Sequence, residues 1–203
     1  MFLRFVNLAS RNIFMKNTNK LGINTTCVHV GEVKDKQFKG AVSPMYMSTS
    51  YAFDGVEVKR YPRYYNTPNQ EMLCKKIAAL ENTEAGLIFS SGMAAISSAM
   101  LAFLERGDHV IVQQVIYGGT YNFIVSEFDK YGIEYSFTES DKAEDFKALI
   151  KENTKILYIE TPSNPLLGIT DMVAISNIAK ENDILTMIDN TFATPINQNP
   201  ANF

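Results

Sequence analysis

The feature that most constrains the fold is an alternation of short apolar runs with helical periods. Five runs are short, and apolar or β-branched enough for buried strands: 85–89, 109–112, 133–137, 155–160 and 184–189. Apolar residues recur at helical spacing before and between them, over 69–80 (with Asn69 as the expected cap), 93–104, 121–131, 143–150 and 171–181. Strands that alternate with helices predict βαβ units, and hence an α/β fold with a mostly parallel sheet and helices on both faces.

The chain before residue 69 has a different character. Residues 21–68 show no clear period, so we expect an extended N-terminal arm that packs on another surface. Residues 1–31 contain Arg and Lys but no acid, which resembles a transit peptide. The favoured alternative is that translation starts at Met15, so that residues 1–20 are a disordered or wrongly included N-terminal extension. Residues 69–203 are then a partial α/β domain.

The composition excludes several classes of protein. With 46% hydrophobic and 20% charged residues, the chain has the material for a globular core. A net charge of −3 gives no electrostatic argument for nucleic acid, and no apolar run approaches the roughly 20 residues of a membrane span. Cys27 and Cys74 are isolated, so we expect reduced thiols, no metal site and a cytoplasmic location.

Four motifs follow expected strands directly. They are Ser90-Ser91-Gly92-Met93, Tyr117-Gly118-Gly119-Thr120, Glu160-Thr161-Pro162-Ser163-Asn164-Pro165 and Asp189-Asn190-Thr191. Ligands of parallel α/β sheets bind beyond the carboxyl ends of the strands. The sequence therefore predicts a ligand site at the edge where these motifs gather.

Two motifs suggest charge recognition. Ser91-Gly92-Met93 stands where a strand turns into a helix, and the free N–H groups of a first helical turn bind anions. The carboxylate of Asp189 ends a strand and would face the crevice. Each has a plain structural alternative, because Ser-Gly is common in strand–helix turns and Asp-Asn-Thr is good turn chemistry.

Three further side chains have suitable chemistry for a flat, phosphorylated ligand. Tyr117 could stack on a ring, and Asn164, in a stiff loop between two prolines, could donate its amide. Arg63 suits a phosphate, and Tyr61 would point the same way in an extended chain. In isolation, a loop tyrosine, a turn asparagine and a solvated arginine are the simpler interpretations.

Taken together, the chain from about Asn24 to Phe203 resembles the trans-sulfuration enzymes, the group of cystathionine γ-synthase, γ-lyase and β-lyase. Further matches in the family's order are Cys27-Val28-His29-Val30-Gly31, Thr49-Ser50-Tyr51 and Leu80-Glu81. The resemblance implies the large domain of a fold-type-I pyridoxal-phosphate-dependent transferase, with pyridoxal 5′-phosphate as cofactor and a small amino acid as substrate. It also implies a homo-oligomer, a homotetramer in this family, and γ-elimination or γ-replacement on homoserine-derived amino acids.

The resemblance also assigns roles to residues. It implies that Ser91, Gly92 and Met93 hold the phosphate, and that Tyr61 and Arg63 reach the phosphate of a neighbouring subunit's cofactor. Tyr117 stacks on the ring and is the candidate catalytic residue. Asn164 lies by the ring hydroxyl, Asp189 pairs with the ring nitrogen, and Thr191 completes the cofactor-binding set.

The departures from the family's pattern bear on activity. The family's Schiff-base lysine and C-terminal domain match no part of these 203 residues, so we expect a fragment that binds the cofactor non-covalently at best. The alternative is a non-catalytic remnant or one half of a split protein. Gly119 stands where methionine γ-lyases tend to have cysteine, and Asn122 where cystathionine-handling members often have arginine. Tyr121-Asn122 also resembles O-acylhomoserine sulfhydrylases, which are a second candidate parent.

Overall fold

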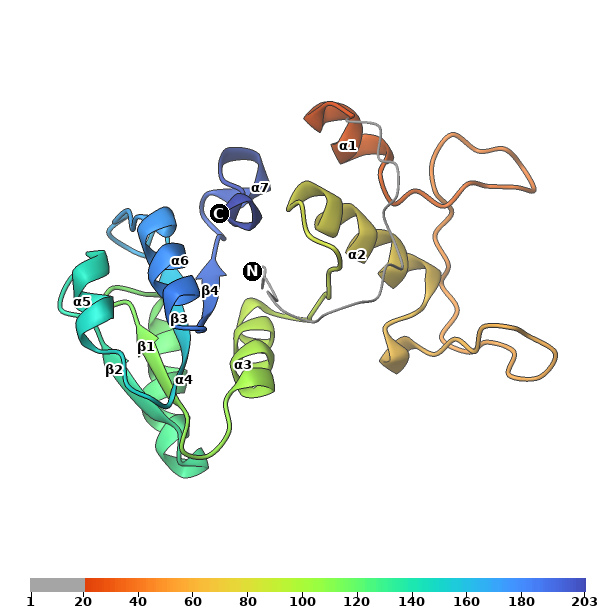
Figure 1. Ribbon diagram of the computed structural model, residues 1–203. Helices are drawn as coiled ribbons and strands as arrows, with labels where there is room; N and C mark the ends of the chain where they lie inside the picture. Colours follow the sequence, from red (N-terminus) through yellow and green to blue (C-terminus); the bar gives the residue numbers. More distant parts are fainter. Residues whose placement is uncertain (1–20) are drawn as a thin grey trace. The chain divides into compact units, whose positions relative to one another are not determined.

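The computed structural model describes residues 21–203, which form two compact units, 21–88 and 89–203. The second unit is built on a four-stranded sheet in the order β2-β1-β3-β4 (Figure 1). The strands are β1 His109–Val112, β2 Glu134–Phe137, β3 Thr154–Glu160 and β4 Leu185–Asp189. Every neighbouring pair is parallel, so all four carboxyl ends meet at one edge, as the sequence predicts.

Helices cover both faces of this sheet and bury a separate core on each. The helices are α3 Gly92–Phe103, α4 Gly118–Tyr131, α5 Ala143–Ala148, α6 Met172–Glu181 and α7 Thr194–Asn197, with a final 3₁₀ turn η2 Pro200–Asn202. Val110 and Val112 pack with α3 and α4, whereas Ile111 between them packs with α5 and α6. The period-two alternation of a strand thus sends adjacent side chains into different cores.

The first unit contains α1 Ile23–His29, the 3₁₀ turn η1 Pro62–Tyr64 and α2 Pro68–Leu80. Helix α1 was not predicted, because no apolar period marks it and none of its residues is buried. Its last turn is held from outside: Lys76 Nζ donates to the carbonyl oxygens of Cys27 and Val28 at 2.9 and 2.8 Å. A lysine at a helix C-terminus satisfies carbonyl groups that the helix leaves unpaired.

The predicted strand 85–89 and the predicted cap of α2 are wrong. Residues 85–89 form no strand in the part of the chain that the structure describes, and Leu87 is 60% exposed. An apolar run becomes a strand only when a neighbour accepts its backbone hydrogen bonds, and the four-stranded sheet does not include this run. The N-cap of α2 is Thr67 rather than Asn69, whose amide instead bonds the backbone of Tyr46 at 3.0 and 2.8 Å.

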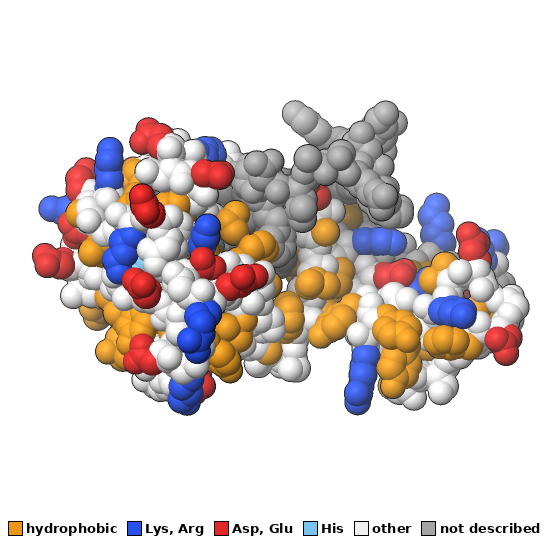
Figure 2. All heavy atoms as spheres, turned by 60° about the horizontal axis from the view of Figure 1, so that its bottom comes forward, with side chains coloured by type: hydrophobic (Ala, Val, Ile, Leu, Met, Phe, Trp, Pro, Cys, Tyr) orange, Lys and Arg blue, Asp and Glu red, His pale blue; other side chains and the backbone are white. Residues whose placement is uncertain are grey.

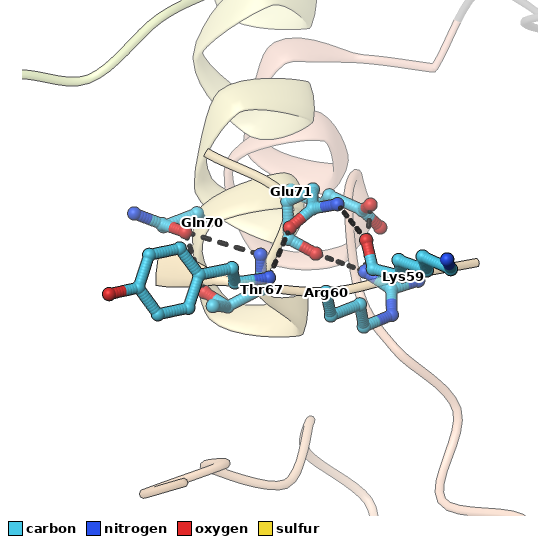
Figure 3. Close-up of polar contacts among 7 residues, drawn as sticks. Lys59, Arg60, Thr67, Gln70 and Glu71 are labelled. Atoms are coloured by element: carbon cyan, nitrogen blue, oxygen red, sulfur yellow. Dashed lines mark hydrogen bonds and ion pairs between the residues drawn. The ribbon is translucent and has the colours of Figure 1, made fainter. Parts of the chain in front are cut away.

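The turn that carries Tyr61 is tied to the start of α2, and Figure 3 shows the contacts of its neighbours. Gln70 Oε1 accepts from the backbone and hydroxyl of Thr67, and Arg60 pairs with Glu71 at 2.8 Å. Asn66 Oδ1 accepts from the Tyr61 N–H at 2.9 Å. Gln70 Nε2 donates to the Pro62 carbonyl at 2.9 Å, which ties η1 to α2. The expectation of extended backbone through Tyr61 and Arg63 is wrong, because the chain turns at Pro62. The division into an arm and a cofactor domain stays a prediction.

The surface agrees with the modest net charge. Figure 2 shows Lys, Arg, Asp and Glu side chains intermixed over the face in view. Among residues 21–203, no helix has the length and apolar character that crossing a bilayer requires. The predictions for residues 1–20 lie outside the described residues.

One buried histidine predicts how stability depends on pH. His109 is fully buried at the start of β1, and its ring nitrogens lie 2.8 Å from Thr154 Oγ1 and 2.9 Å from Ser136 Oγ. Burial, and then the charge of Lys151, lower its pKa below 6.5, although Glu134 opposes this. The unfolded chain therefore binds the proton first. We expect the free energy of unfolding to fall as the pH drops below about 6.5, by at most about 1.4 kcal/mol per pH unit.

Urea unfolding between pH 7.5 and 5 checks this expectation. His109→Gln removes the titrating group and should flatten the pH profile, whereas His29→Gln, at an exposed position, should keep the wild-type slope. Equal slopes in the wild-type chain and His109→Gln would contradict it.

Candidate active site

A cavity lies at the edge of the sheet where the carboxyl ends of the strands meet. Its volume is about 200 Å³, and its lining residues are Gly92, Met93, Ile96, Tyr117, Glu160, Pro162, Asn164, Asp189, Thr191 and Phe192. Six predicted site residues are thereby brought together: Gly92, Met93, Tyr117, Asn164, Asp189 and Thr191. Segments that lie far apart in the sequence meet here because parallel strands end at the same edge.

The N-terminus of α3 opens onto one wall of this cavity. Ser91 is the N-cap, and its Oγ accepts from the Ala94 N–H at 3.0 Å. The first intrahelical bond runs from the Ala95 N–H to the Ser91 carbonyl at 3.1 Å. The N–H groups of Gly92 and Met93 precede that bond and belong to the positive end of a 12-residue helix. This wall is therefore suited to an anion.

Asp189 supplies an acceptor on another wall. It ends β4, is 6% exposed, and receives two bonds on Oδ1, from the Thr191 N–H at 3.0 Å and the Thr191 hydroxyl at 2.5 Å. The structural alternative, in which Asp189 serves only to form the turn Asp189-Asn190-Thr191, thus accounts for Oδ1 but not for Oδ2. Because both Thr191 donors meet Oδ1, the carboxylate is oriented while it still lines the cavity.

Glu160, which the sequence analysis left without a role, is a central part of the site. It ends β3 as the register partner of Asp189 and is 5% exposed. Its Oε2 accepts from the Tyr117 N–H at 2.8 Å, and its Oε1 accepts from the Asn164 N–H at 2.6 Å. Burial raises the pKa of Glu160, the two N–H donors lower it, and the like charge of Asp189 raises it again. A glutamate closing an otherwise apolar strand was the signal available in the sequence.

The backbone of Glu160 is itself clamped by Gln113. Gln113 is fully buried after β1, and its Nε2 donates to the Glu160 carbonyl at 3.1 Å. Its Oε1 accepts from the Glu160 N–H at 3.2 Å and from the Thr170 hydroxyl at 2.9 Å. These bonds extend the pairing of β1 and β3 beyond the sheet and make the floor of the cavity rigid.

The two remaining predicted residues belong to the other unit. Arg63 lies within η1, and Tyr61 directly precedes it. The rings of Tyr61 and Tyr64 pack edge to face with centroids 5.4 Å apart. None of the cavity's lining residues comes from residues 21–88. Also among the described residues, no group of three or more His, Cys, Asp or Glu side chains could hold a metal ion.

Gly119 controls where the Tyr117 ring stands. A Cβ at position 119 would lie 2.5 Å from Tyr117 Cε1 and 3.1 Å from Met93 Sδ. Because Tyr117 is 46% exposed, its ring has room to move aside. We expect Gly119→Ala to displace the ring, with the free energy of unfolding unchanged or raised by up to about 1 kcal/mol through helix propensity.

The aromatic resonances of Tyr117 measure this displacement. Gly118→Ala is the matched control, because a Cβ there meets nothing within 4 Å. If both variants leave the Tyr117 resonances where the wild-type chain has them, Gly119 does not set the ring position.

Comparison with known proteins identifies the family. Residues 24–203 match the family model described as "Cys/Met metabolism PLP-dependent enzyme". The chain is 39% identical over 193 residues to the L-methionine gamma-lyase of Fusobacterium nucleatum subsp. nucleatum, covering 89% of this chain and 48% of that protein. It is 40% identical to the cystathionine gamma-lyase of Bacillus subtilis, covering 87% of this chain and 47% of that protein.

The fold agrees with the sequence match. A crystal structure of cystathionine gamma-lyase from Lactobacillus plantarum, complexed with L-serine, superposes with a TM-score of 0.83 at 34% identity, covering 90% of this chain and 48% of that one. The chain therefore spans about half the length of the relatives it matches. The predicted α/β fold class is confirmed, and the chain belongs to the Cys/Met metabolism family of pyridoxal-phosphate-dependent enzymes.

Proposed function

We propose that this chain forms the cofactor-binding part of a trans-sulfuration enzyme of the cystathionine γ-synthase or γ-lyase type. Such an enzyme eliminates or replaces the group at the γ carbon of a homoserine-derived amino acid. One observation carries the proposal: the N-terminus of α3, the ring of Tyr117 and the carboxylate of Asp189 all line a single cavity. These are an anion site, an aromatic face and an acceptor, as a phosphorylated pyridine ring requires.

The residues present fit pyridoxal phosphate. A Cβ at Gly92 would meet nothing within 4 Å, so the open space at the N-terminus of α3 admits a phosphate close to the backbone. The carboxylate of Asp189 lines the same cavity and is already oriented by Thr191. When bound, the cofactor withdraws electrons from the α carbon of the substrate.

Each side chain then has a distinct task. Asp189 holds a proton on the ring nitrogen, because a carboxylate beside a pyridine favours its protonated form. Gly92 and Met93 bind the phosphate through their N–H groups, with Ser91 ordering the turn. Tyr117 covers the ring face, and Asn164 orients the ring through its amide. Together these residues would hold the phosphate, the ring nitrogen and the ring of the cofactor.

The parts of the reaction beyond this cavity involve other chain segments. In our proposal, Tyr61 and Arg63 bind the phosphate in a neighbouring subunit of a homo-oligomer. We propose that none of the lysines among these 203 residues, of which Lys180 is the last, binds the cofactor covalently. Borohydride reduction of this chain with pyridoxal phosphate should therefore label no single lysine; specific labelling would contradict this part of the proposal.

A second candidate is an O-acylhomoserine sulfhydrylase. Tyr121 and Asn122 occupy exposed positions on the first turns of α4, the helix whose N-terminus carries Tyr117. An activity assay of a full-length protein that contains this chain distinguishes the two candidates. A sulfhydrylase takes sulfide as nucleophile, whereas a cystathionine γ-synthase takes cysteine. A non-catalytic remnant would use neither.

Binding of pyridoxal phosphate to the 203-residue chain tests the proposal at its base. Gly92→Ala adds one methyl group in the space assigned to the phosphate and, because that space is open, leaves the fold intact. We expect equilibrium dialysis to show affinity lowered by about 10- to 100-fold, the range of about 1–3 kcal/mol for overpacking. Equal affinity of Gly92→Ala and the wild-type chain would remove α3 from the site.

A further inference from the structure

Glu160 connects two walls of the cavity that lie beyond the paired ends of β1 and β3. Tyr117 precedes α4, and Asn164 lies in the loop after β3, 47 residues further along the chain. The Tyr117 N–H bonds one carboxylate oxygen at 2.8 Å, and the Asn164 N–H bonds the other at 2.6 Å. One side chain thus bonds the backbone of both residues.

Glu160 can hold both residues because its own backbone is held by Gln113. Glu160 closes β3, and its own N–H and carbonyl are both bound by the Gln113 amide. With 5% of its surface exposed, the carboxylate has little water to compete for its two donors. Charge-assisted bonds of this kind are shorter and stronger than neutral ones. A displacement of β3 would therefore carry Tyr117 and Asn164 together.

A carboxylate in this place is costly, which argues against a role in packing alone. Glu160 is the register partner of Asp189, so two acidic side chains end adjacent strands at one edge. Burial and the charge of Asp189 both raise its pKa, opposing ionisation. A glutamine in this place would avoid this repulsion, but its amide lacks a second oxygen to accept the second N–H.

We propose that Glu160 is a positioning residue that sets where Tyr117 and Asn164 stand in the cavity. In this way it sets the distance between the backbone of Tyr117, which we propose covers the cofactor ring, and the backbone of Asn164, which we propose orients that ring. That pyridoxal phosphate binds between these residues rests on the proposed function, but the two hydrogen bonds to Glu160 are a property of the chain alone.

Glu160→Gln tests the anchor with almost no change of shape. Glutamine offers one acceptor oxygen, and its NH₂ group faces the other backbone donor. We expect amide hydrogen exchange of Tyr117 or Asn164 to accelerate at least tenfold, while Val110 and Leu157 in the sheet keep their protection. Glu134→Gln removes an equal charge from an exposed ion pair with Lys151 and should leave all four amides unchanged.

Two outcomes would overturn the assignment. The first is exchange of Tyr117 and Asn164 within twofold of the wild-type rates in Glu160→Gln. The second is loss of protection at Val110 and Leu157 to the same extent, which is global destabilisation. Dialysis against pyridoxal phosphate separates the two proposals: we expect Glu160→Gln to weaken binding at least tenfold. A wild-type chain that binds none would contradict the proposed function, and the exchange rates would still decide the anchor.

Discussion

Asp189→Asn should lower the affinity of the chain for pyridoxal phosphate by about 10- to 100-fold. A hydrogen bond to a charged group is worth about 1.5–3 kcal/mol, and the amide replaces it with a group that cannot hold the proton on the ring nitrogen. The substitution keeps an acceptor for Thr191, which bonds Oδ1 at 3.0 and 2.5 Å. Equilibrium dialysis measures the change.

A second readout of Asp189→Asn requires no cofactor. The charge of Asp189 is one of the causes that raise the pKa of Glu160, so the Glu160 carboxyl should titrate at lower pH in the variant. Asp171→Asn is the matched control, because asparagine caps α6 as well as aspartate and the same charge is lost elsewhere. Unchanged affinity in Asp189→Asn would show that the carboxylate does not contact the ring.

Phe128→Ala should cost about 3–5 kcal/mol of unfolding free energy, the usual range for a buried phenylalanine. Phe128 lies on the buried face of α4 and packs edge to face on Phe123 and Tyr135, with centroids 5.4 and 6.3 Å apart. A domain is stable by only about 5–15 kcal/mol, so this single loss threatens the whole unit.

Urea unfolding provides the measurement, and Tyr131→Ala on the same helix provides the control. Tyr131 is 49% exposed, so its loss should cost less than about 1 kcal/mol. Because α4 begins beside Tyr117, we also expect Phe128→Ala to weaken cofactor binding at concentrations of urea that leave the wild-type site intact. Equal midpoints for Phe128→Ala and Tyr131→Ala would contradict the assignment of Phe128 to the core.

The sheet was predictable from sequence because its two central strands, β1 and β3, are almost entirely buried and mostly apolar. The run 109–112 is β1, residue for residue, and 155–160 misses only Thr154 of β3. Helix α3 begins at Gly92, one residue before its predicted start. Where tertiary contacts decide the structure, the prediction was wrong or silent: 85–89 lacks a partner strand, and α1 depends on Lys76.

Part of the site was predictable because the expected sheet is parallel. Motifs placed after parallel strands must meet, so Gly92, Tyr117, Asn164 and Asp189 could be grouped without coordinates. Glu160 could not be given a role, because its two donors come from different loops and only the folded chain brings them to one carboxylate. Gln113 was missed because most of its partners are backbone groups, which leave no trace in the sequence.

A titration of the ¹⁵N-labelled chain with pyridoxal phosphate, followed by amide NMR, tests the central claim most directly. The account predicts the largest shifts at Gly92, Met93, Asn164 and Thr191, which line the cavity. The amides of His109 and Glu134, at the start of β1 and β2, should not move, because they lie at the opposite edge of the sheet. Shifts centred on those two residues, or no saturable shift at the cavity, would contradict the assignment of a cofactor site to this edge.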